Sequence, residues 1–490
     1  MSWPVPKFEE LPAPQKPSPW LAAVCSIGVM FAAAVVIFVS WPKLHEQSGG
    51  IEFWLCLVGI PLMLGLALWC AILHFAGMAA FGVDCLAYYT DAVLLAWQRW
   101  GRQYAVLGGF SVLLVEDALA EKIAGLSEAA PRNKSEVRRL EEIAEDFKST
   151  RTEQVLERLL RGSKDAVLSS GIDDTLRIIA STGEHTDAGE IEQSILKQWD
   201  ALNLRIPITV EPVSEISWPV IERSVIDERT PVLLLSVQLH DNGDEFARFT
   251  ESAVALLFQP NLPQLDSGAP VVRIYRSMPA STASMLTDFQ QLGESGAVPL
   301  ARIRTGWNCN LGKADGYALS RAVGDCGLVL EGGTSGMVNV SDSIGPVGPI
   351  SPWISLALAA ELVQYGQGPQ LLASQEGKQA RLYITCADEP ASSLRMGVPP
   401  LSASHISVFL VGLLPIFTIL FGVLFKAADL FPWVAAGVAG AMILALALRL
   451  LHPGLVQMRA MKEVEALGGR LPPMDDGQSL SGVSGIARRK

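Results

Sequence analysis

Apolar residues are concentrated near the two ends of the chain, in four long runs. The runs cover residues 20–41, 53–81, 406–425 and 431–448. A bilayer core about 30 Å thick is crossed by roughly 20 apolar residues in a helix, so each run is long enough to span it. Short connections join the runs in pairs. The pattern therefore predicts two transmembrane helical hairpins, at 20–82 and 405–451, on either side of a less apolar region.

Two spans at each end place three segments on one side of the membrane. These are a polar, Pro-rich N-terminal tail (1–19), the central region (83–404) and a C-terminal tail (452–490). Their basic residues near the spans are Lys7, Lys16, Arg99, Arg102, Arg459, Lys462 and Arg488–Lys490, whereas the hairpin loops hold Lys43 and Lys426. By the positive-inside rule, both termini and the central region are cytoplasmic. A polar tail before the first run and a second run after it are not typical of a cleaved signal peptide.

His74 lies in the second apolar run. An ionisable residue inside a membrane is a candidate functional residue. However, none of the four runs contains a carboxylate that could exchange a proton with it. We therefore favour a neutral histidine that faces the helix bundle, and its role stays open.

The first part of the central region, 83–204, has a mixed helix and strand pattern. A Trp/Tyr-rich helix is expected to leave the membrane along its interface. The apolar run 108–117 predicts a buried strand. A charged helix is then expected, with Val137, Leu140, Ile143 and Phe147 at helical spacing, continuing through Leu160.

The second part, 205–400, contains two similar successions of elements. An apolar strand at 231–241 is followed by a polar turn and the apolar segment 249–260. Later in the chain, a loop leads into a long apolar helix and a closing hairpin that turns at Glu376-Gly377-Lys378. Alternating strands and buried helices in two similar halves predict a layered α/β domain.

Two segments resemble the thiolase-like superfamily, specifically the ketoacyl-synthase type of two-half fold. FTESAVALLFQP (249–260) is similar to the segment that ends the first half, and NVSDSIGPVGPISPWISLALAAELV (339–363) to a glycine loop that enters a long helix. Glu251, Asn339, Gly345 and Gly348 occupy the positions of these motif loops. The resemblance covers about 205–387 and implies a thiolase-like core.

The residues of a condensing enzyme are missing from this sequence. Such an enzyme needs a cysteine activated at a helix N-terminus and His or Asn side chains for the developing enolate. No cysteine lies between Leu86 and Asn308, and no histidine between Asp241 and Ser404. Packing roles are expected for the later cysteines, Cys309, Cys326 and Cys386. The prediction is a pseudoenzyme without catalytic residues.

Other site chemistry is weakly represented. GGTSG (332–336) lacks the Gly-Lys-Ser/Thr of a phosphate loop. The group His240, Asp241, Asp244 and Glu245 follows a strand and is interpreted as a solvated turn, not a metal site. Neither a cofactor nor a metal is expected.

Composition agrees with a membrane protein that does not bind nucleic acid. Charged residues are 18% and apolar residues 50% of the chain, and the mean hydropathy is +0.31. The formal net charge of −12 argues against a nucleic-acid surface. Seven scattered cysteines show neither a disulfide framework nor zinc-ligand spacing.

The layout of two spans, a degenerate thiolase-like domain and two further spans also resembles bacterial proteins found with type VI secretion machinery, including lipase-effector adaptors. That resemblance implies an inner-membrane accessory protein that binds a secreted effector or needle-tip component. The alternative is a protein that binds or modifies membrane lipid or acyl chains. A homodimeric scaffold is a third interpretation.

Overall fold

The computed structural model describes residues 3–8, 18–44, 50–133, 135–141, 143, 149–172, 175–181, 188–240, 247–260, 271–330, 337–390 and 454–466. The chain forms two compact units. The first combines Met1–Val5 with Trp97–Leu394, and the second combines Pro6–Ala96 with Arg395–Lys490. The predicted spans 406–425 and 431–448 lie outside the described residues, so the second hairpin stays a prediction.

The first unit contains one eleven-stranded sheet made of two halves with the same strand order. Along the sheet the strands follow β3-β2-β4-β5-β1 and then β6-β11-β10-β8-β9. In the first half, β3, β2 and β4 are parallel, and β5 is antiparallel to β4 and β1. In the second half, β9, β8 and β10 are parallel, and β11 is antiparallel to β10 and β6. The predicted α/β class and internal duplication are therefore confirmed.

The strands have the following bounds: β1 (Tyr104–Leu113), β2 (Leu176–Ser181), β3 (Ile208–Pro212), β4 (Val232–Gln238), β5 (Ser252–Pro260), β6 (Val272–Tyr275), β7 (Met278–Ala280), β8 (Thr305–Cys309), β9 (Met337–Val338), β10 (Gln370–Glu376) and β11 (Gln379–Cys386). The halves join where β1 pairs antiparallel with β6, Ala105 opposite Ile274. The short strand β7 pairs with β11 after a break at Arg276 and Ser277.

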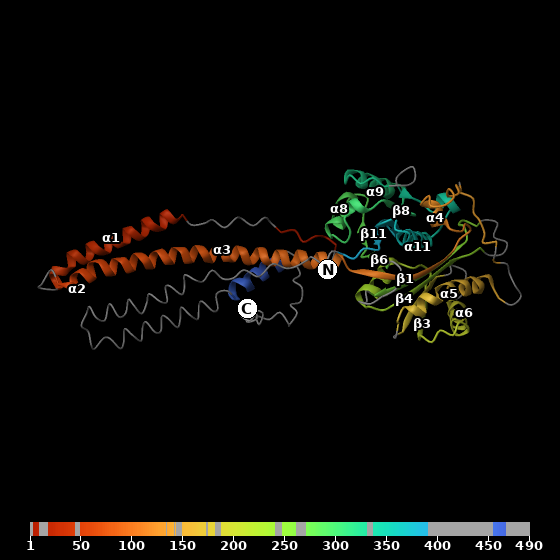
Figure 1. Cartoon of the computed structure of the whole chain (residues 1–490), viewed down its shortest axis with the longest axis horizontal. Coiled ribbons are helices and arrows are strands. Elements are labelled where there is room, and N and C mark those ends of the chain that lie inside the picture. Colours follow the sequence, from red (N-terminus) through yellow and green to blue (C-terminus); the bar gives the residue numbers. More distant parts are fainter. Residues whose placement is uncertain are drawn as a thin grey trace. The chain divides into compact units, whose positions relative to one another are not determined.

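Helices cover both outer faces of the sheet and fill the space between its halves (Figure 1). Their bounds are α4 (Leu119–Ile123), α5 (Arg151–Ser169), α6 (Ala188–Ala201), α7 (Trp218–Glu222), η2 (Arg223–Asp227), α8 (Met285–Glu294), η3 (Leu300–Arg302), α9 (Lys313–Asp325), α10 (Ser341–Ile344) and α11 (Ser351–Gln364). Strand alternation explains the layers: in β4, Leu233 packs with α5 and α6, whereas Leu234 packs with α7 and α11. Helices α8 and α9 cover the outer face of the second half.

Helix α11 lies at the centre of these layers. It contacts strands of both halves, and its residues from Trp353 to Ala360 are all buried. A helix that is apolar on every side is stable only when it is enclosed, and this agrees with the long apolar helix that the sequence predicted.

The charged helix predicted from Val137 begins later than expected. Thr150 and Glu153 form a reciprocal capping box, which starts α5 at Arg151. The described residues before it are not helical, although Leu140 and Ile143 are buried beside α5. Apolar residues at helical spacing thus belong partly to an extended segment, and the prediction of a helix there is wrong. Phe147 lies outside the described residues.

The second unit contains α1 (Pro19–Leu44), α2 (Ile51–Trp54), the π-helical turn η1 (Leu55–Gly59) and α3 (Ile60–Gly101) as far as Ala96. Among the described helices, one segment, Trp20–Val39, is long and apolar enough to cross a membrane. The predicted second span lies mostly in α3, which continues beyond Phe81 to Gly101 without a break. Of the four spans in the two predicted hairpins, the structure therefore supports the first one. The His74 side chain is outside the described part of the chain.

Candidate functional site

A cavity of about 420 Å³ lies between elements of the two halves of the first unit. Residues on the segment between β3 and α7 form one wall, and the loop before α11 and the β10–β11 hairpin form the others. The lining residues are Glu215, Ile216, Ser217, Trp218, Phe249, Asn310, Gly348, Pro349, Pro352, Trp353, Ser374, Gln375, Glu376, Gly377 and Tyr383. We take this cavity as the candidate site.

A carboxylate occupies the N-terminus of α7 at this cavity. Glu376 Oε1 accepts hydrogen bonds from Ser217 Oγ at 2.8 Å and from the main-chain N–H of Trp218 at 3.0 Å. Its Oε2 is paired with Arg381 Nε. Helix N-termini attract negative charge, so the first half of the fold is capped by an acidic side chain of the second. The donors at this helix end are thereby already used.

Stacked aromatic rings form a rigid wall of the cavity. The rings of Trp218 and Tyr383 are 4.9 Å apart and inclined by 9°, and Trp353 lies 5.7 Å from Trp218. Burial raises the pKa of Tyr383 well above its ordinary value, so this phenol is neutral at physiological pH. It is therefore not a base in the resting protein.

Gly348, one of the four motif residues, lines this cavity. A Cβ atom there would lie 2.7 Å from Gln238 Oε1 and 2.8 Å from Phe249. Asn310 donates from Nδ2 to the carbonyls of Val347 at 2.9 Å and Gly348 at 2.7 Å. The sequence resemblance thus singled out a residue of the candidate site, on a loop with space only for glycine.

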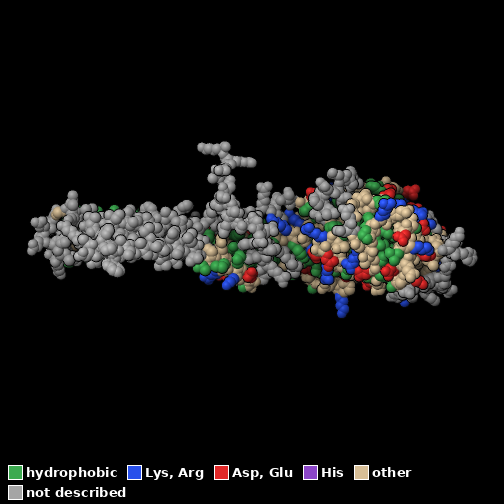
Figure 2. Space-filling view, turned by 90° about the horizontal axis from the view of Figure 1, so that it is seen from below, with side chains coloured by type: hydrophobic (Ala, Val, Ile, Leu, Met, Phe, Trp, Pro, Cys, Tyr) green, Lys and Arg blue, Asp and Glu red, His purple; other side chains and the backbone are tan. Residues whose placement is uncertain are grey.

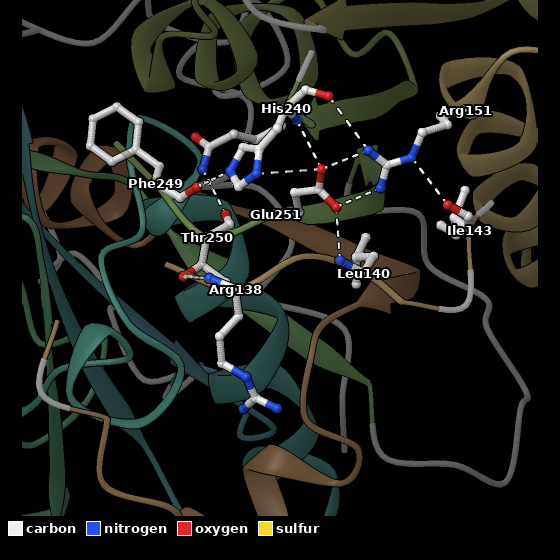
Figure 3. Close-up of polar contacts among 9 residues, drawn as sticks. Arg138, Leu140, Ile143, Arg151, His240, Phe249, Thr250 and Glu251 are labelled. Atoms are coloured by element: carbon white, nitrogen blue, oxygen red, sulfur yellow. Dashed lines mark hydrogen bonds and ion pairs between the residues drawn. The ribbon is translucent and has the colours of Figure 1, made fainter. Parts of the chain in front are cut away.

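Glu251, a second motif residue, is buried in a polar network beside the start of β5 (Figure 3). Arg151 donates to both carboxylate oxygens, at 2.9 and 2.7 Å. The main-chain N–H groups of Leu140 and His240 donate at 2.7 and 2.9 Å. Burial raises the pKa of Glu251, but these hydrogen bonds outweigh it and hold the pKa below its ordinary value. Glu251 therefore connects β5 to three other segments, those of Leu140, Arg151 and His240, through hydrogen bonds.

Gly345 and Asn339 have local structural roles. Gly345 has φ = +94°, and a Cβ there would lie 2.2 Å from the carbonyl oxygen of Glu136. The adjacent Thr250 donates to Pro346 and Ile344 carbonyls at 2.7 and 3.0 Å, so this loop is held against the start of β5. Asn339 Oδ1 accepts from the N–H of Ser341 at 3.0 Å, at the beginning of α10.

The later cysteines are placed as packing residues would be. Cys309 is fully buried, and burial raises its pKa to about 12. Burial likewise raises the pKa of Cys386 to about 11 and that of Cys326 to a smaller extent. These thiols are protonated at neutral pH and are poor nucleophiles. None of the three lines the cavity.

Of the group His240, Asp241, Asp244 and Glu245, the structure describes His240. His240 Nε2 contacts the carbonyl of Phe249, and Nδ1 lies 3.6 Å from Glu251 Oε1. Asp241, Asp244, Glu245 and the second histidine, His185, are outside the described residues, as is the 332–336 loop. Within the described ranges, no cluster of three or more His, Cys, Asp or Glu side chains could hold a metal ion.

Sequence reasoning missed Ser217 and Glu376 as partners. Ser217-Trp218-Pro219 has the order of a helix start, a capping residue followed by a proline in the first turn, and this signal was available. Glu376 was identified only as a turn residue, and the hairpin there is confirmed by the pairing of Glu376 with Gln379. Because 159 residues separate it from Ser217, no local pattern could reveal the contact.

Comparisons with known proteins give structural similarities only. No family model matches the chain, and no curated protein matches it. It is similar to a type II polyketide acyl-carrier protein complex with its ketosynthase (TM-score 0.42, 10% identity, 59% of this chain and 100% of that one). It is also similar to 3-oxoacyl-[acyl-carrier-protein] synthase III of Aquifex aeolicus VF5 (0.34, 12%, 58% and 99%) and of Pseudomonas aeruginosa PAO1 (0.35, 15%, 58% and 98%).

Proposed function

We propose that this chain is a non-catalytic, membrane-anchored binding protein of thiolase-like fold. The strand order repeated in the two halves, with α11 enclosed between them, supports the thiolase-like assignment. Fold alone does not determine activity, so the functional part rests on the site.

The observation that carries the proposal is the carboxylate of Glu376 at the N-terminus of α7. A condensing reaction would need a thiolate at a helix N-terminus and free donors for an enolate oxygen. Here the N–H of Trp218 and the hydroxyl of Ser217 donate to Glu376 instead. A negative side chain at that place opposes a second negative charge. Neither cysteine nor histidine is among the lining residues.

The membrane part of the proposal rests on the residues that flank segment 6–96 along the chain. Trp3 packs edge-on against Trp97 and Trp100, with ring centroids 6.1 and 5.3 Å apart, within the first unit. Residues 6–96, which include the apolar α1, therefore leave this unit and return to it. A single crossing by α1 requires a second crossing before Trp97. This supports two spans within 20–81.

The C-terminal end supports the same arrangement. The helical residues 454–466 contribute Ala460 and Val464 to a buried cluster with Phe81 and Tyr89 of α3. The C-terminal segment thus packs on α3 where the predicted second span ends and on the turns that follow it. We place both termini and the central domain in the cytoplasm, and the chain as a multi-pass protein of a bacterial inner membrane.

The partner that we assign is a protein, either a secreted effector or a component of a type VI-like secretion apparatus. This part of the proposal derives from the layout of the chain. A homodimer of the first unit is compatible with it.

The test combines an activity assay with purification of the full chain in detergent. We expect no condensation product from acyl and malonyl thioesters, and co-purification of one defined protein whose amount falls when the cavity is blocked. Turnover that is lost in Ser217→Ala would overturn the non-catalytic assignment. Purification without any protein partner, but with a stoichiometric lipid, would overturn the adaptor assignment.

A second candidate function is the binding of a membrane lipid or acyl chain. The observation that favours it is the apolar part of the cavity wall, which includes Ile216, Phe249 and Trp353. Native mass spectrometry of the detergent-solubilised chain separates the two functions, since an acyl ligand adds a defined mass that a protein partner does not.

A further inference from the structure

Arg276 and Ser277 form a buried polar junction between β6 and β7, the 276–277 junction. The two residues are 5% and 1% exposed. Both connections of segment 6–96 to the first unit contact this junction. On the N-terminal side, Trp3 Nε1 donates to Ser277 O. On the other side, the Arg276 guanidinium lies 4.6 Å from the ring centre of Trp100, near the end of α3. The two places where the chain enters and leaves the unit are thus fixed on the same two residues.

The hydroxyl of Ser277 connects this junction to residues of the candidate site. It donates to Glu222 Oε2 at 2.6 Å and accepts from Arg381 Nη1 at 3.0 Å. A serine hydroxyl has a single hydrogen to donate, so the bond to Glu222 uses that hydrogen and the bond from Arg381 uses a lone pair. Ser277 therefore joins α7, which ends at Glu222, to the guanidinium that is paired with Glu376.

Both ends of α7 are held through these contacts. At its C-terminal end, Glu222 also accepts from Ser277 N, at 3.1 Å. At its N-terminal end, the Glu376 carboxylate accepts two hydrogen bonds and is itself paired with Arg381. A helix of five residues is too short to be stable alone, so its position at the cavity depends on these contacts.

Arg381 controls the charge at the N-terminus of α7. Its guanidinium is a rigid fork of N–H donors, of which one contacts Glu376 and another contacts Ser277. A displacement of Ser277 therefore changes how closely the guanidinium compensates the carboxylate. On the face of the first unit that Figure 2 shows, acidic and basic side chains are interspersed. The charge at this helix end is thus set by its own contacts and not by a field of one sign over that face.

We infer that the 276–277 junction links the anchoring of segment 6–96 to the electrostatics of the candidate site. While Trp3 holds the junction, Arg381 is kept on Glu376, and the carboxylate at the N-terminus of α7 is compensated. When Trp3 leaves the junction, Arg381 loses this support and the negative charge at the cavity increases. Contiguous hydrogen bonds and packed side chains of this kind carry energetic coupling between distant sites. The inference rests on the proposed function and names its regulation, since capture of the partner then depends on how the membrane segment is held.

The test measures the titration of a thiol at position 217 in the full chain, purified in detergent. In Ser217→Cys, alkylation of that residue by iodoacetamide is followed by peptide mass spectrometry as a function of pH. Adding Trp3→Ala is expected to move the profile to higher pH by about half a unit, because a less compensated Glu376 opposes the thiolate as strongly as a partly exposed ion pair would. The matched control Phe289→Ala removes a side chain of similar energetic cost from the buried cluster that contains Trp3, and it is expected to leave the profile unchanged.

A second comparison asks whether the effect passes through the junction. In Ser277→Ala the hydroxyl that contacts Arg381 is absent, so Trp3→Ala is expected to add no further shift to the profile. Should Ser277→Ala fail to fold, Arg381→Lys replaces it, because one ammonium group lacks the fork of donors that joins the two partners. The inference would be overturned by an equal effect of Trp3→Ala with and without this contact, by no effect at all, or by an equal shift in Phe289→Ala.

Co-purification of the protein partner separates this inference from the proposed function. The amount of captured partner is expected to fall in Trp3→Ala and to stay unchanged in Phe289→Ala. Absence of any partner from the parent chain, with the shift at position 217 present, would overturn the adaptor function and leave the link within the fold standing. An unshifted profile in a chain that still captures its partner would overturn the inference alone.

Discussion

Arg151 and Glu251 form a bidentate ion pair at the base of β5, in which the carboxylate is completely buried and the arginine side chain is 12% exposed. The same carboxylate accepts main-chain N–H groups from two other segments. Glu251 therefore fixes the extended chain near Leu140, the first turn of α5 and the end of β4 in one place. The loop with Gly345 is attached next to it through Thr250.

Removing one partner of this pair is expected to destabilise the first unit strongly. Arg151→Ala or Glu251→Gln leaves buried polar groups unsatisfied, at a cost of about 3–5 kcal/mol in the free energy of unfolding. Urea denaturation monitored by tryptophan fluorescence measures it. The control is Arg161→Ala, which breaks an exposed pair with Glu157 in α5 and should cost no more than about 0.5 kcal/mol. Similar values for both substitutions would contradict the structural role of Glu251.

Acid is expected to weaken the same network. The folded-state pKa of Glu251 is lower than its ordinary value, so the carboxylate contributes stability above its unfolded pKa of about 4.3. That contribution is lost as the pH falls through the lower, folded pKa. The free energy of unfolding measured from neutral to acidic pH should therefore fall less steeply in Glu251→Gln than in the parent chain. An unchanged slope would mean that other carboxylates control the acid response.

Gly345 is expected to tolerate no side chain. In Gly345→Ala the new Cβ would meet a main-chain oxygen at 2.2 Å and would also sit at φ = +94°. Gly125→Ala is the matched control, because Gly125 has φ = +67° with nothing within 4 Å of the added atom. The control isolates the backbone strain, about 1 kcal/mol. Thermal unfolding should show a much larger loss of stability for Gly345→Ala than for Gly125→Ala. Equal losses of stability would show that the close contact between position 345 and the main chain does not exclude a side chain there.

The sequence predicted the elements that depend on local pattern and missed the contacts between distant ones. The strand β4, the apolar helix α11 and the hairpin at Gly377 follow from apolar runs and turn chemistry. The segment before Thr150 did not, because Leu140 and Ile143 are buried by contacts with α5 and Glu251 and not by a helix of their own. The capping of α7 by Glu376 depends on a fold already formed.

The N-terminal Trp3 is expected to anchor the chain on the first unit. It is 7% exposed, Trp97 Nε1 donates to its carbonyl at 3.2 Å, and its own Nε1 donates to Ser277 O. Trp3→Ala should destabilise this unit by about 3 kcal/mol, the usual cost of a buried tryptophan. Hydrogen exchange at β7 is expected to become faster. Trp20→Ala, at a side chain 78% exposed on α1, is the control. Equal exchange in both variants would show that residues 3–5 do not hold the unit.

A thiol introduced at the N-terminus of α7 is expected to be unreactive while Glu376 is present. Helix N-termini normally lower the pKa of a cysteine, but in Ser217→Cys the adjacent carboxylate would raise it. In the double variant Ser217→Cys, Glu376→Gln the negative charge is gone, so the thiol should titrate at lower pH. The rate of alkylation by iodoacetamide at residue 217, followed by peptide mass spectrometry and measured against pH, reports this shift separately from the native cysteines, of which Cys25 is exposed and Cys309 buried. If the two pH profiles coincide, Glu376 does not set the electrostatics of this helix end, and the main support for a non-catalytic site is removed.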